Sequence, residues 1–227
     1  MADPIVEFGR DGQPVEADGR LDSQAFHRNH SAIRTVLLRY LNGKTGDVLE
    51  AGSGTGQHVV DFARHLPDIT WWPSDLSEHH RRSIAAWRAQ AALANLRAPL
   101  SIDLTDPAWC DQVRLAGGPS HGLAVFCANV IHIAPWRVTE GLLSGAARYL
   151  LPDGHLLLYG PFKRAGRHTA PSNAAFDDSL RQANPEWGVR DLEALQRVAA
   201  DVAIELVETV EMPANNLVLV FGRNQAG

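Results

Sequence analysis

The sequence has little of what marks secreted, membrane or nucleic-acid-binding proteins. Its only two cysteines, Cys110 and Cys127, lie in unrelated contexts, which favours a reducing compartment over a disulfide framework. No run approaches the roughly 18 to 20 apolar residues of a membrane helix, and residues 1–20 lack the pattern of a signal or transit peptide. With 26 acidic against 21 basic residues, the chain is a poor partner for a nucleic-acid backbone. We expect a soluble cytoplasmic protein that binds neither membrane nor nucleic acid; composition says nothing of its oligomeric state.

Apolar runs of strand type alternate with longer stretches at helical spacing. Strands are expected at 47–51, 69–73, 99–103, 122–131 and 155–160, followed by a final pair at 203–212 and 216–222. Helices are expected within 23–41, where apolar residues recur at helical spacing from Ile33 to Leu41, and at 56–66, 78–96, 135–151 and 192–200. Ser77 and Asp191 are the expected N-caps. This order predicts one doubly wound, Rossmann-like α/β domain over 21–227, with helices on both faces of a mostly parallel sheet and an antiparallel edge. Residues 1–20 are expected to form a polar arm.

The stretch DVLEAGSGTGQH, residues 47–58, raises the question of a ligand. Gly52, Gly54 and Gly56 lie between an expected strand and an expected helix, where a flexible backbone and a helix N-terminus suit an anionic or polar ligand. A nucleoside triphosphate, a dinucleotide, S-adenosylmethionine and no ligand at all are the candidates. The absence of a Gly-Lys-Ser/Thr ending excludes a P-loop, and the G-x-G-x-G spacing departs from the dinucleotide fingerprint. Glu50, just before the glycines, favours a ligand with an ammonium group.

Two further acids follow the next two expected strands. Asp75 lies about twenty residues beyond the glycines, where an acid can accept both hydroxyls of a ribose; capping of the following helix is its alternative role. Asp103 is placed to meet an adenine amino group, with Leu104 beside the ring. Acids at three successive strand ends fit an adenosine ligand that crosses the top of the sheet.

Several segments together carry a family resemblance. They are RNH, GSGTGQH, WWPSD, NVIHIAPW, LLLYGPFKRAGRHTAPSNAAFD, WGVRDLE and MPANNL. With these segments, from about residue 20 to its end, the chain resembles the DUF938 family, a methyltransferase-like group related to the methyltransferase-like 26 proteins. The glycine motif alone is moderately specific, and the long run at 159–177 is much more specific. The arrangement of the glycines and the acids resembles class I S-adenosylmethionine-dependent methyltransferases.

The resemblance implies a seven-stranded sheet whose last strand is antiparallel, with S-adenosylmethionine as cofactor. Carried over by position, its methionine part would be held at Glu50, Gly52, Ser53, Gly54 and Gly56. The ribose would lie on Asp75, the adenine between Asp103 and Leu104, and the sulfonium beside Asn129. Arg28 and Asn29, placed before the first helix, would close over the cofactor, with Arg28 on its carboxylate; a surface arginine is the alternative.

Candidates for catalysis and substrate binding follow the fourth and fifth expected strands. His132 is the first choice as proton acceptor, because imidazole titrates near neutral pH; support of the loop is its alternative role. Tyr159 could exchange a proton or belong to the core. His168 lies in an expected lid, where Ser172 caps a short helix and, with Asn173, either binds a polar substrate or stabilises the turn. Trp136 would face the sulfonium or pack in the core.

We therefore expect a methyltransferase that acts on a small molecule by direct displacement. One alternative is an enzyme of the same fold that cyclises or cleaves the cofactor and releases methylthioadenosine. A dinucleotide-dependent oxidoreductase is disfavoured by the glycine spacing, and a non-catalytic sensor of an adenosyl ligand stays open. The histidines form no His-Glu-x-x-His motif and the cysteines no Cys-x-x-Cys motif, so no metal is expected.

Overall fold

The computed structural model describes residues 13–14 and 18–223. Of the expected arm, residues 1–12 and 15–17 lie outside the described residues. The remainder includes β1 (Gln13–Pro14), which pairs antiparallel with β2 (Leu21–Asp22). Within the described ranges, no helix is both long and apolar enough to span a membrane.

Six strands form the main sheet, in the order β10-β11-β6-β5-β3-β4. Their bounds are β3 (Gly46–Ala51), β4 (Ile69–Ser74), β5 (Gly122–Ala128), β6 (Leu150–Gly160), β10 (Ile204–Met212) and β11 (Asn216–Arg223). Strands β4, β3, β5 and β6 are parallel to one another, whereas β11 runs antiparallel to both β6 and β10. The expected parallel sheet with an antiparallel last strand is confirmed.

The expected count of seven strands is wrong, because residues 99–103 do not form a strand. The chain runs beside β4 there and touches it only through two isolated bridges, Trp71 to Leu96 and Ser74 to Leu100. Proline has no N–H to donate to a strand ladder, and both Pro73 in β4 and Pro99 in the neighbouring segment interrupt the pairing. The segment nevertheless continues the layer at the β4 edge.

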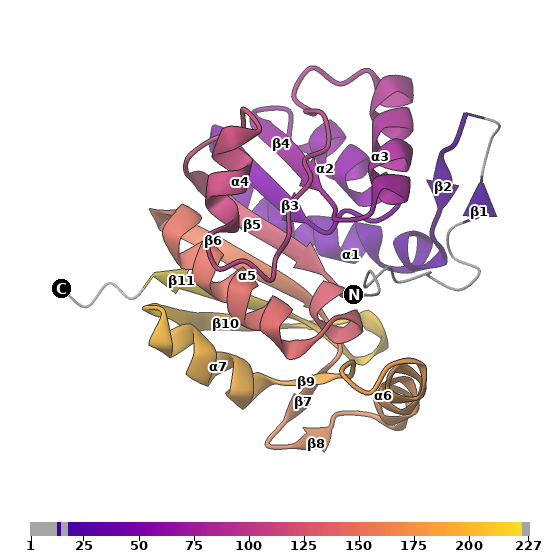
Figure 1. Ribbon diagram of the computed structural model, residues 1–227, viewed down its shortest axis with the longest axis vertical. Coiled ribbons are helices and arrows are strands. Elements are labelled where there is room, and N and C mark those ends of the chain that lie inside the picture. Colours follow the sequence, from indigo (N-terminus) through magenta and orange to yellow (C-terminus); the bar gives the residue numbers. More distant parts are fainter. Residues whose placement is uncertain (1–12, 15–17, 224–227) are drawn as a thin grey trace.

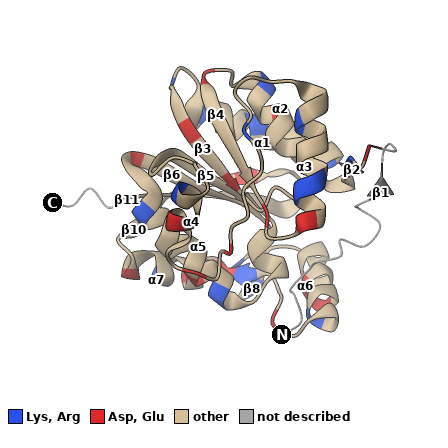
Figure 2. Ribbon diagram, turned by 45° about the horizontal axis from the view of Figure 1, so that its top comes forward, with Lys and Arg blue, Asp and Glu red and all other residues tan. Residues whose placement is uncertain are grey.

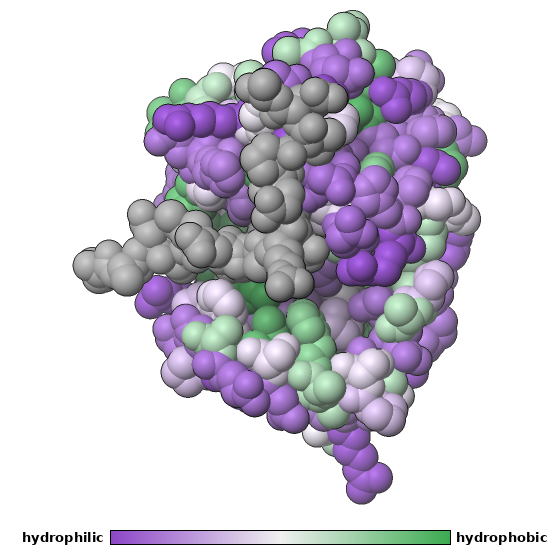
Figure 3. Space-filling view, turned by 90° about the vertical axis from the view of Figure 1, so that its right-hand side faces the viewer, coloured by the Kyte–Doolittle hydropathy of each residue, from purple (hydrophilic) through white to green (hydrophobic). Residues whose placement is uncertain are grey.

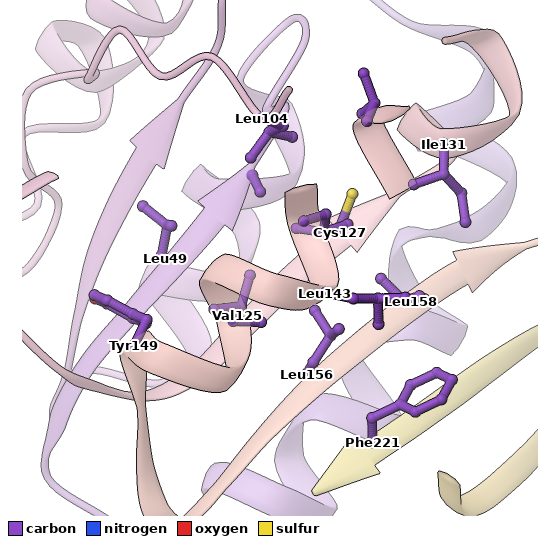
Figure 4. Close-up of a cluster of buried hydrophobic side chains, with 14 of the residues drawn as sticks. Leu49, Leu104, Val125, Cys127, Ile131, Leu143, Tyr149, Leu156, Leu158 and Phe221 are labelled. Carbon is purple, nitrogen blue, oxygen red and sulfur yellow. The ribbon is translucent and has the colours of Figure 1, made fainter. Parts of the chain in front are cut away.

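Helices cover both faces of the sheet, as expected (Figure 1). Helices α1 (Gln24–Leu41), α2 (Gln57–His65) and α3 (Glu78–Ala91) pack on one face. Helices α4 (Trp109–Leu115), α5 (Trp136–Tyr149) and α7 (Leu192–Asp201) pack on the other. Figure 4 shows how side chains of β3, β5 and β6, among them Leu49, Val125 and Leu158, meet those of α5 in this second layer.

The helix caps divide into confirmed and wrong predictions. The Ser77 side chain accepts a hydrogen bond from the His80 N–H, and Asp191 accepts one from the Ala194 N–H, so both N-caps are confirmed. Ser172 does not cap α6 (Pro171–Ala183), because the helix begins at Pro171 and Ala170 holds the cap position. Proline suits the first helical turn, where its missing N–H costs nothing.

The segment after β6 builds a small second sheet where no strand was expected. Strand β7 (Phe162–Arg164) pairs antiparallel with β8 (Arg167–His168) and parallel with β9 (Arg190–Asp191). Figure 1 shows this sheet and α6 together below the main sheet, on the side where β6 ends. The strands are two or three residues long, too short for a recognisable alternation of apolar and polar residues.

Sheet order places a ligand site beside the glycine turn. From β3 the chain passes to β4 on one side, and it then crosses to β5 on the other side of β3. In open α/β sheets, ligands bind at the carboxyl ends of the strands at such a switch point. The turn at 52–56 follows β3 directly and therefore lies at this point.

Candidate functional site

The three glycines of the turn have different reasons to be glycine. All have positive φ, which favours a residue without a side chain. A Cβ on Gly52 would lie 2.3 Å from the Val130 side chain, and one on Gly56 would lie 2.8 Å from the Ile84 backbone of α3. A Cβ on Gly54 would meet nothing within 4 Å. Gly52 and Gly56 therefore allow close packing, whereas Gly54 faces open space.

That space belongs to a cavity of about 440 Å³ at the ends of β3, β4 and β5. Five residues predicted to hold the cofactor line it: Gly52, Gly54, Asp75, Asp103 and Leu104. Part of its remaining lining comes from residues at the start of α3 and of α5, which the sequence prediction did not include: Leu76, His79 and His80 from one, Pro135, Arg137 and Val138 from the other.

Asp75 is fixed by the glycine turn and by α3 together. Its Oδ2 accepts a hydrogen bond from the Gly54 N–H at 2.9 Å, and its Oδ1 accepts one from the Ser77 N–H at 2.9 Å. The Nδ1 atom of His80 lies 3.2 Å from the same Oδ1. Asp75 thus supports the start of α3, as the alternative prediction held, and also presents a carboxylate to the cavity.

Asp103 is held in the cavity wall by its own loop. Its Oδ1 accepts hydrogen bonds from the N–H and from the hydroxyl of Thr105, at 2.9 and 2.7 Å. Carboxylates carry about four lone-pair sites, so Oδ2 retains the capacity to accept a bond from a ligand. Leu104, its neighbour in the chain, adds an apolar surface to the same wall.

Glu50 is a buried carboxyl under the glycine turn. Its side chain is almost wholly buried and its Oε2 has no hydrogen-bond partner in the described part of the chain. Burial, with a further contribution from the charge of Asp75, raises the pKa of Glu50 to about 8. Ser53 beside it is buried too, and its Oγ accepts a bond from the Ser74 N–H at 3.1 Å. A buried acceptor without a partner suits a cationic ligand group.

Four of the remaining predicted residues meet in a smaller cavity of about 140 Å³. These are Arg28, Asn29, Asn129 and Tyr159. The prediction that Arg28 and Asn29 precede the first helix is wrong, because α1 begins at Gln24 and both residues lie in its first turns. An N-cap at Ser23 allows this earlier start, since its side chain accepts a bond from the Phe26 N–H.

The backbone at residues 128–130 lies between the two cavities. Ala128 and Val130 line the larger cavity, and Asn129 lines the smaller one. Asn129 has φ of +61°, a left-handed conformation that asparagine tolerates better than most residues. This turn directs its side chain away from those of its neighbours.

His132 lines neither cavity. It is completely buried, its Nδ1 accepts a hydrogen bond from the Arg190 N–H at 3.4 Å, and its ring packs edge-on against Phe162 with centroids 5.0 Å apart. Burial, together with the charge of Arg190, lowers the pKa of His132 to about 3. Imidazole in these surroundings is neutral and enclosed, which fits support of the loop better than proton transfer to a ligand.

The predicted lid residues also lie outside both cavities. His168 Nε2 is 3.3 Å from Asp177 Oδ2, which also pairs with Lys163 at 2.7 Å. Asn173 donates to the backbone carbonyl of Asn215 at 2.9 Å, and Ser172 is exposed on α6. The two contacts of Asp177 hold the segment after β6 together, and the Asn173 bond joins that segment to the turn between β10 and β11.

Trp136 lines neither cavity and packs, partly buried, against the core on the face of the sheet that α5 covers, as its alternative prediction held. The Arg190 guanidinium lies 5.6 Å from the centre of its ring. Within the described ranges, no cluster of three or more histidine, cysteine, aspartate or glutamate side chains could hold a metal ion.

Two further views show where charged residues and apolar residues lie on the molecule. Figure 2 shows basic and acidic residues interspersed over the helices. Figure 3 shows the side on which α6 and β2 lie, where polar residues surround a smaller group of apolar ones.

Residues 20–223 match the family model described as "Protein of unknown function (DUF938)". The chain belongs to the DUF938 family. The match includes every residue that lines the two cavities, so both belong to the family region of this DUF938 protein.

Solved methyltransferases have the same fold at low sequence identity. An O-methyltransferase family protein from Burkholderia thailandensis is 16% identical, with a TM-score of 0.73 over 89% of this chain and 58% of that one. CalO1, a methyltransferase in calicheamicin biosynthesis solved with S-adenosylhomocysteine, is 16% identical, with a TM-score of 0.66 over 86% and 54%. A putative O-methyltransferase from Nostoc punctiforme is 14% identical, with a TM-score of 0.67 over 87% and 57%. The DUF938 chain thus spans little more than half the length of these proteins and has their fold.

Proposed function

We propose that this DUF938 protein is a methyltransferase that uses S-adenosylmethionine and acts on a small-molecule acceptor. One observation carries the proposal. The larger cavity lies at the switch point of the sheet. It is lined by the open glycine turn after β3, by Asp75 after β4 and by Asp103 from the segment beside β4. Its volume of about 440 Å³ falls within the range of about 300 to 1,000 Å³ that is typical of small-molecule sites.

The residues around the larger cavity match the chemistry of the cofactor. Asp75 would accept the ribose hydroxyls, and Asp103 would accept the adenine amino group with Leu104 against the ring. The cofactor ammonium would supply the missing partner of Glu50, whose Oε2 is buried and unsatisfied. Gly54 leaves room for the ligand to approach the turn. CalO1, which has this fold, was solved with the demethylated cofactor S-adenosylhomocysteine.

When bound, the cofactor supplies an electrophilic methyl group on a sulfonium. The protein then has to orient the acceptor, exclude water and receive a proton if the nucleophile carries one. Asn129 and Tyr159 line the smaller cavity, from which an acceptor would approach. Among the predicted catalytic residues, Tyr159 reaches a cavity, whereas His132 and His168 do not.

The test is calorimetry with S-adenosylhomocysteine and with NADH. We expect binding of the first and none of the second. The Asp75→Ala variant should bind S-adenosylhomocysteine about 10- to 150-fold more weakly, since a hydrogen bond to a charged group contributes about 1.5–3 kcal/mol. Asp111→Ala, which removes an exposed carboxylate on α4, is the control and should bind like the wild type.

Two results would contradict the proposal. Tight binding of NADH without binding of S-adenosylhomocysteine would point to an oxidoreductase. Release of methylthioadenosine from S-adenosylmethionine alone, at a steady rate without any acceptor, would show that the cofactor is itself the substrate.

A further inference from the structure

The smaller cavity gathers polar side chains from four separate parts of the chain. Helix α1 contributes Arg28 and Asn29, the end of β5 contributes Asn129, and the end of β6 contributes Tyr159. The turn between β10 and β11 completes it with Pro213, Ala214 and Asn216. All four parts meet at one end of the sheet, next to the larger cavity.

We propose that the smaller cavity binds the methyl acceptor through a carboxylate group, so that the acceptor is a small carboxylic acid. The proposal rests on the function proposed above and names the substrate class of that enzyme. Residues 128–130 link the two cavities, which places a molecule bound at Asn129 next to the ligand of the larger cavity.

The charge of the cavity favours an anion. Arg28 lines it and makes no hydrogen bond or ion pair within the part of the chain that the structure describes. No aspartate or glutamate is among the described residues that line the cavity. A guanidinium group binds a carboxylate through two parallel hydrogen bonds, a geometry that neutral amides or amines do not match. An ammonium-bearing acceptor would instead be repelled by Arg28.

Two side chains, Asn29 and His58, orient a second contact, the Tyr159 phenol. Burial lowers the pKa of His58 to about 3, so its ring is neutral, and its Nε2 lies 2.7 Å from Asn29 Oδ1. If Nε2 carries the ring proton, it donates to this oxygen and leaves the Asn29 amide nitrogen to donate to the Tyr159 phenol oxygen. Asn29 and His58 are thus positioning residues for Tyr159.

The phenol of Tyr159 is left as a donor toward the cavity. Burial raises its pKa, although the Asn29 hydrogen bond and the charge of Arg28 oppose this shift, so the hydroxyl keeps its proton at neutral pH. With its oxygen accepting from Asn29, the O–H can donate to a carboxylate held by Arg28. The cavity volume of about 140 Å³ restricts the acceptor to a small molecule.

The experiment uses two matched pairs of probes on protein saturated with S-adenosylhomocysteine. Lactate is compared with lactamide, and 4-hydroxybenzoate with 4-hydroxybenzamide, by calorimetry. We expect at least one carboxylate to bind tenfold or more tightly than its amide. Arg28→Met should abolish this preference and change the affinity for S-adenosylhomocysteine less than threefold. Arg39→Met, an exposed position on the same helix paired with Glu208, is the control and should keep the preference.

A double-mutant cycle tests the positioning of Tyr159. Tyr159→Phe and Asn29→Leu should each weaken the binding of the preferred carboxylate about tenfold. The double variant should be no weaker than either single variant, because both remove the same hydrogen bond to the probe. Additive losses, with the double variant about a hundredfold weaker, would overturn the role of Asn29.

Two results overturn the proposal as a whole. One is the absence of any preference for the carboxylates, which includes failure of all four probes to bind. The other is an Arg28→Met variant that loses S-adenosylhomocysteine affinity tenfold or more and still prefers the carboxylate; Arg28 would then hold the cofactor. Failure of the wild type to bind S-adenosylhomocysteine is a separate result, which contradicts the proposed function itself.

Discussion

Among single residues, Glu50 combines almost complete burial with a carboxyl oxygen that has no hydrogen-bond partner in the described part of the chain. A carboxyl group buried without a partner for Oε2 is costly to ionise, and its raised pKa keeps it protonated over much of the neutral range. The ammonium group of a bound ligand would give this carboxyl group the partner that it lacks. The acidic residue before the glycines could be predicted as a ligand contact from sequence; its burial and its raised pKa could not, because they depend on the packing of β3 between β4 and β5.

The raised pKa predicts a specific dependence of stability on pH. Between the unfolded pKa of 4.5 and the folded value of about 8, the folded protein binds more protons at Glu50 than the unfolded chain does. Its stability therefore falls as pH rises through this window, by at most about 1.4 kcal/mol per pH unit from this one group. Glu50→Gln should lose this slope, so that the variant gains on the wild type from pH 5 to pH 8 in urea unfolding without ligand.

Glu140→Gln, an exposed change on α5, is the control and should follow the wild type. The buried histidines, whose pKa values are lowered, are present in all three proteins, so their effect cancels in the comparison. Parallel curves for the wild type and Glu50→Gln would contradict the account of Glu50.

Among the elements, the turn after β5 shows what sequence reasoning can and cannot reach. Its position at a strand end could be predicted from the apolar run of β5, and Asn129 does reach a cavity. The direction in which the His132 side chain points could not be predicted. It depends on the small sheet of β7, β8 and β9, whose strands pair through contacts distant in sequence within residues 161–191. Gly160 and Gly188 both approach this histidine closely.

We expect loss of His132 to affect stability rather than ligand binding. His132→Ala should lower the free energy of unfolding by about 2–5 kcal/mol, the usual loss when a large buried side chain is truncated. Affinity for S-adenosylhomocysteine should stay within about threefold at a temperature where the variant is folded. His121→Ala, at an exposed position before β5, should unfold like the wild type.

The stability of His132→Ala should also depend on pH differently from that of the wild type. The folded pKa of His132, about 3, lies below the ordinary value of 6.5, so its contribution to stability is present above pH 6.5 and is lost as pH falls toward 3. His132→Ala should therefore lose less stability than the wild type between pH 6.5 and pH 4. A variant with unchanged stability but a large loss of turnover would restore the prediction that His132 is the proton acceptor.

Other elements were missed for local reasons. Helix α4 is seven residues long and begins without a side-chain cap. Neither apolar periodicity nor a capping residue therefore predicts it from the sequence. The expected third strand, residues 99–103, does not form because Pro73 and Pro99 interrupt its hydrogen bonds to β4. The segment still runs beside β4. Asp75, which follows β4, and Asp103, which ends the segment expected as a strand, both line the larger cavity. Strand ends are easier to predict than the pairing of the strands.

For the whole molecule, the arrangement of two cavities on either side of residues 128–130 is the central feature. The larger one gathers the residues predicted for the adenosyl part of the cofactor, and the smaller one gathers residues from both ends of the chain. Neither cavity could be predicted from the sequence, because each is lined by elements that are distant in sequence and that only the order of the strands brings together.

The most direct test of the account is a crystal structure of the protein with S-adenosylhomocysteine. The account predicts electron density in the larger cavity, with the ribose hydroxyls on Asp75, the adenine amino group on Asp103 and the ammonium group facing Glu50. The smaller cavity should remain free for an acceptor. Density for the ligand in the smaller cavity, or no density in either at a saturating concentration, would contradict the central claim.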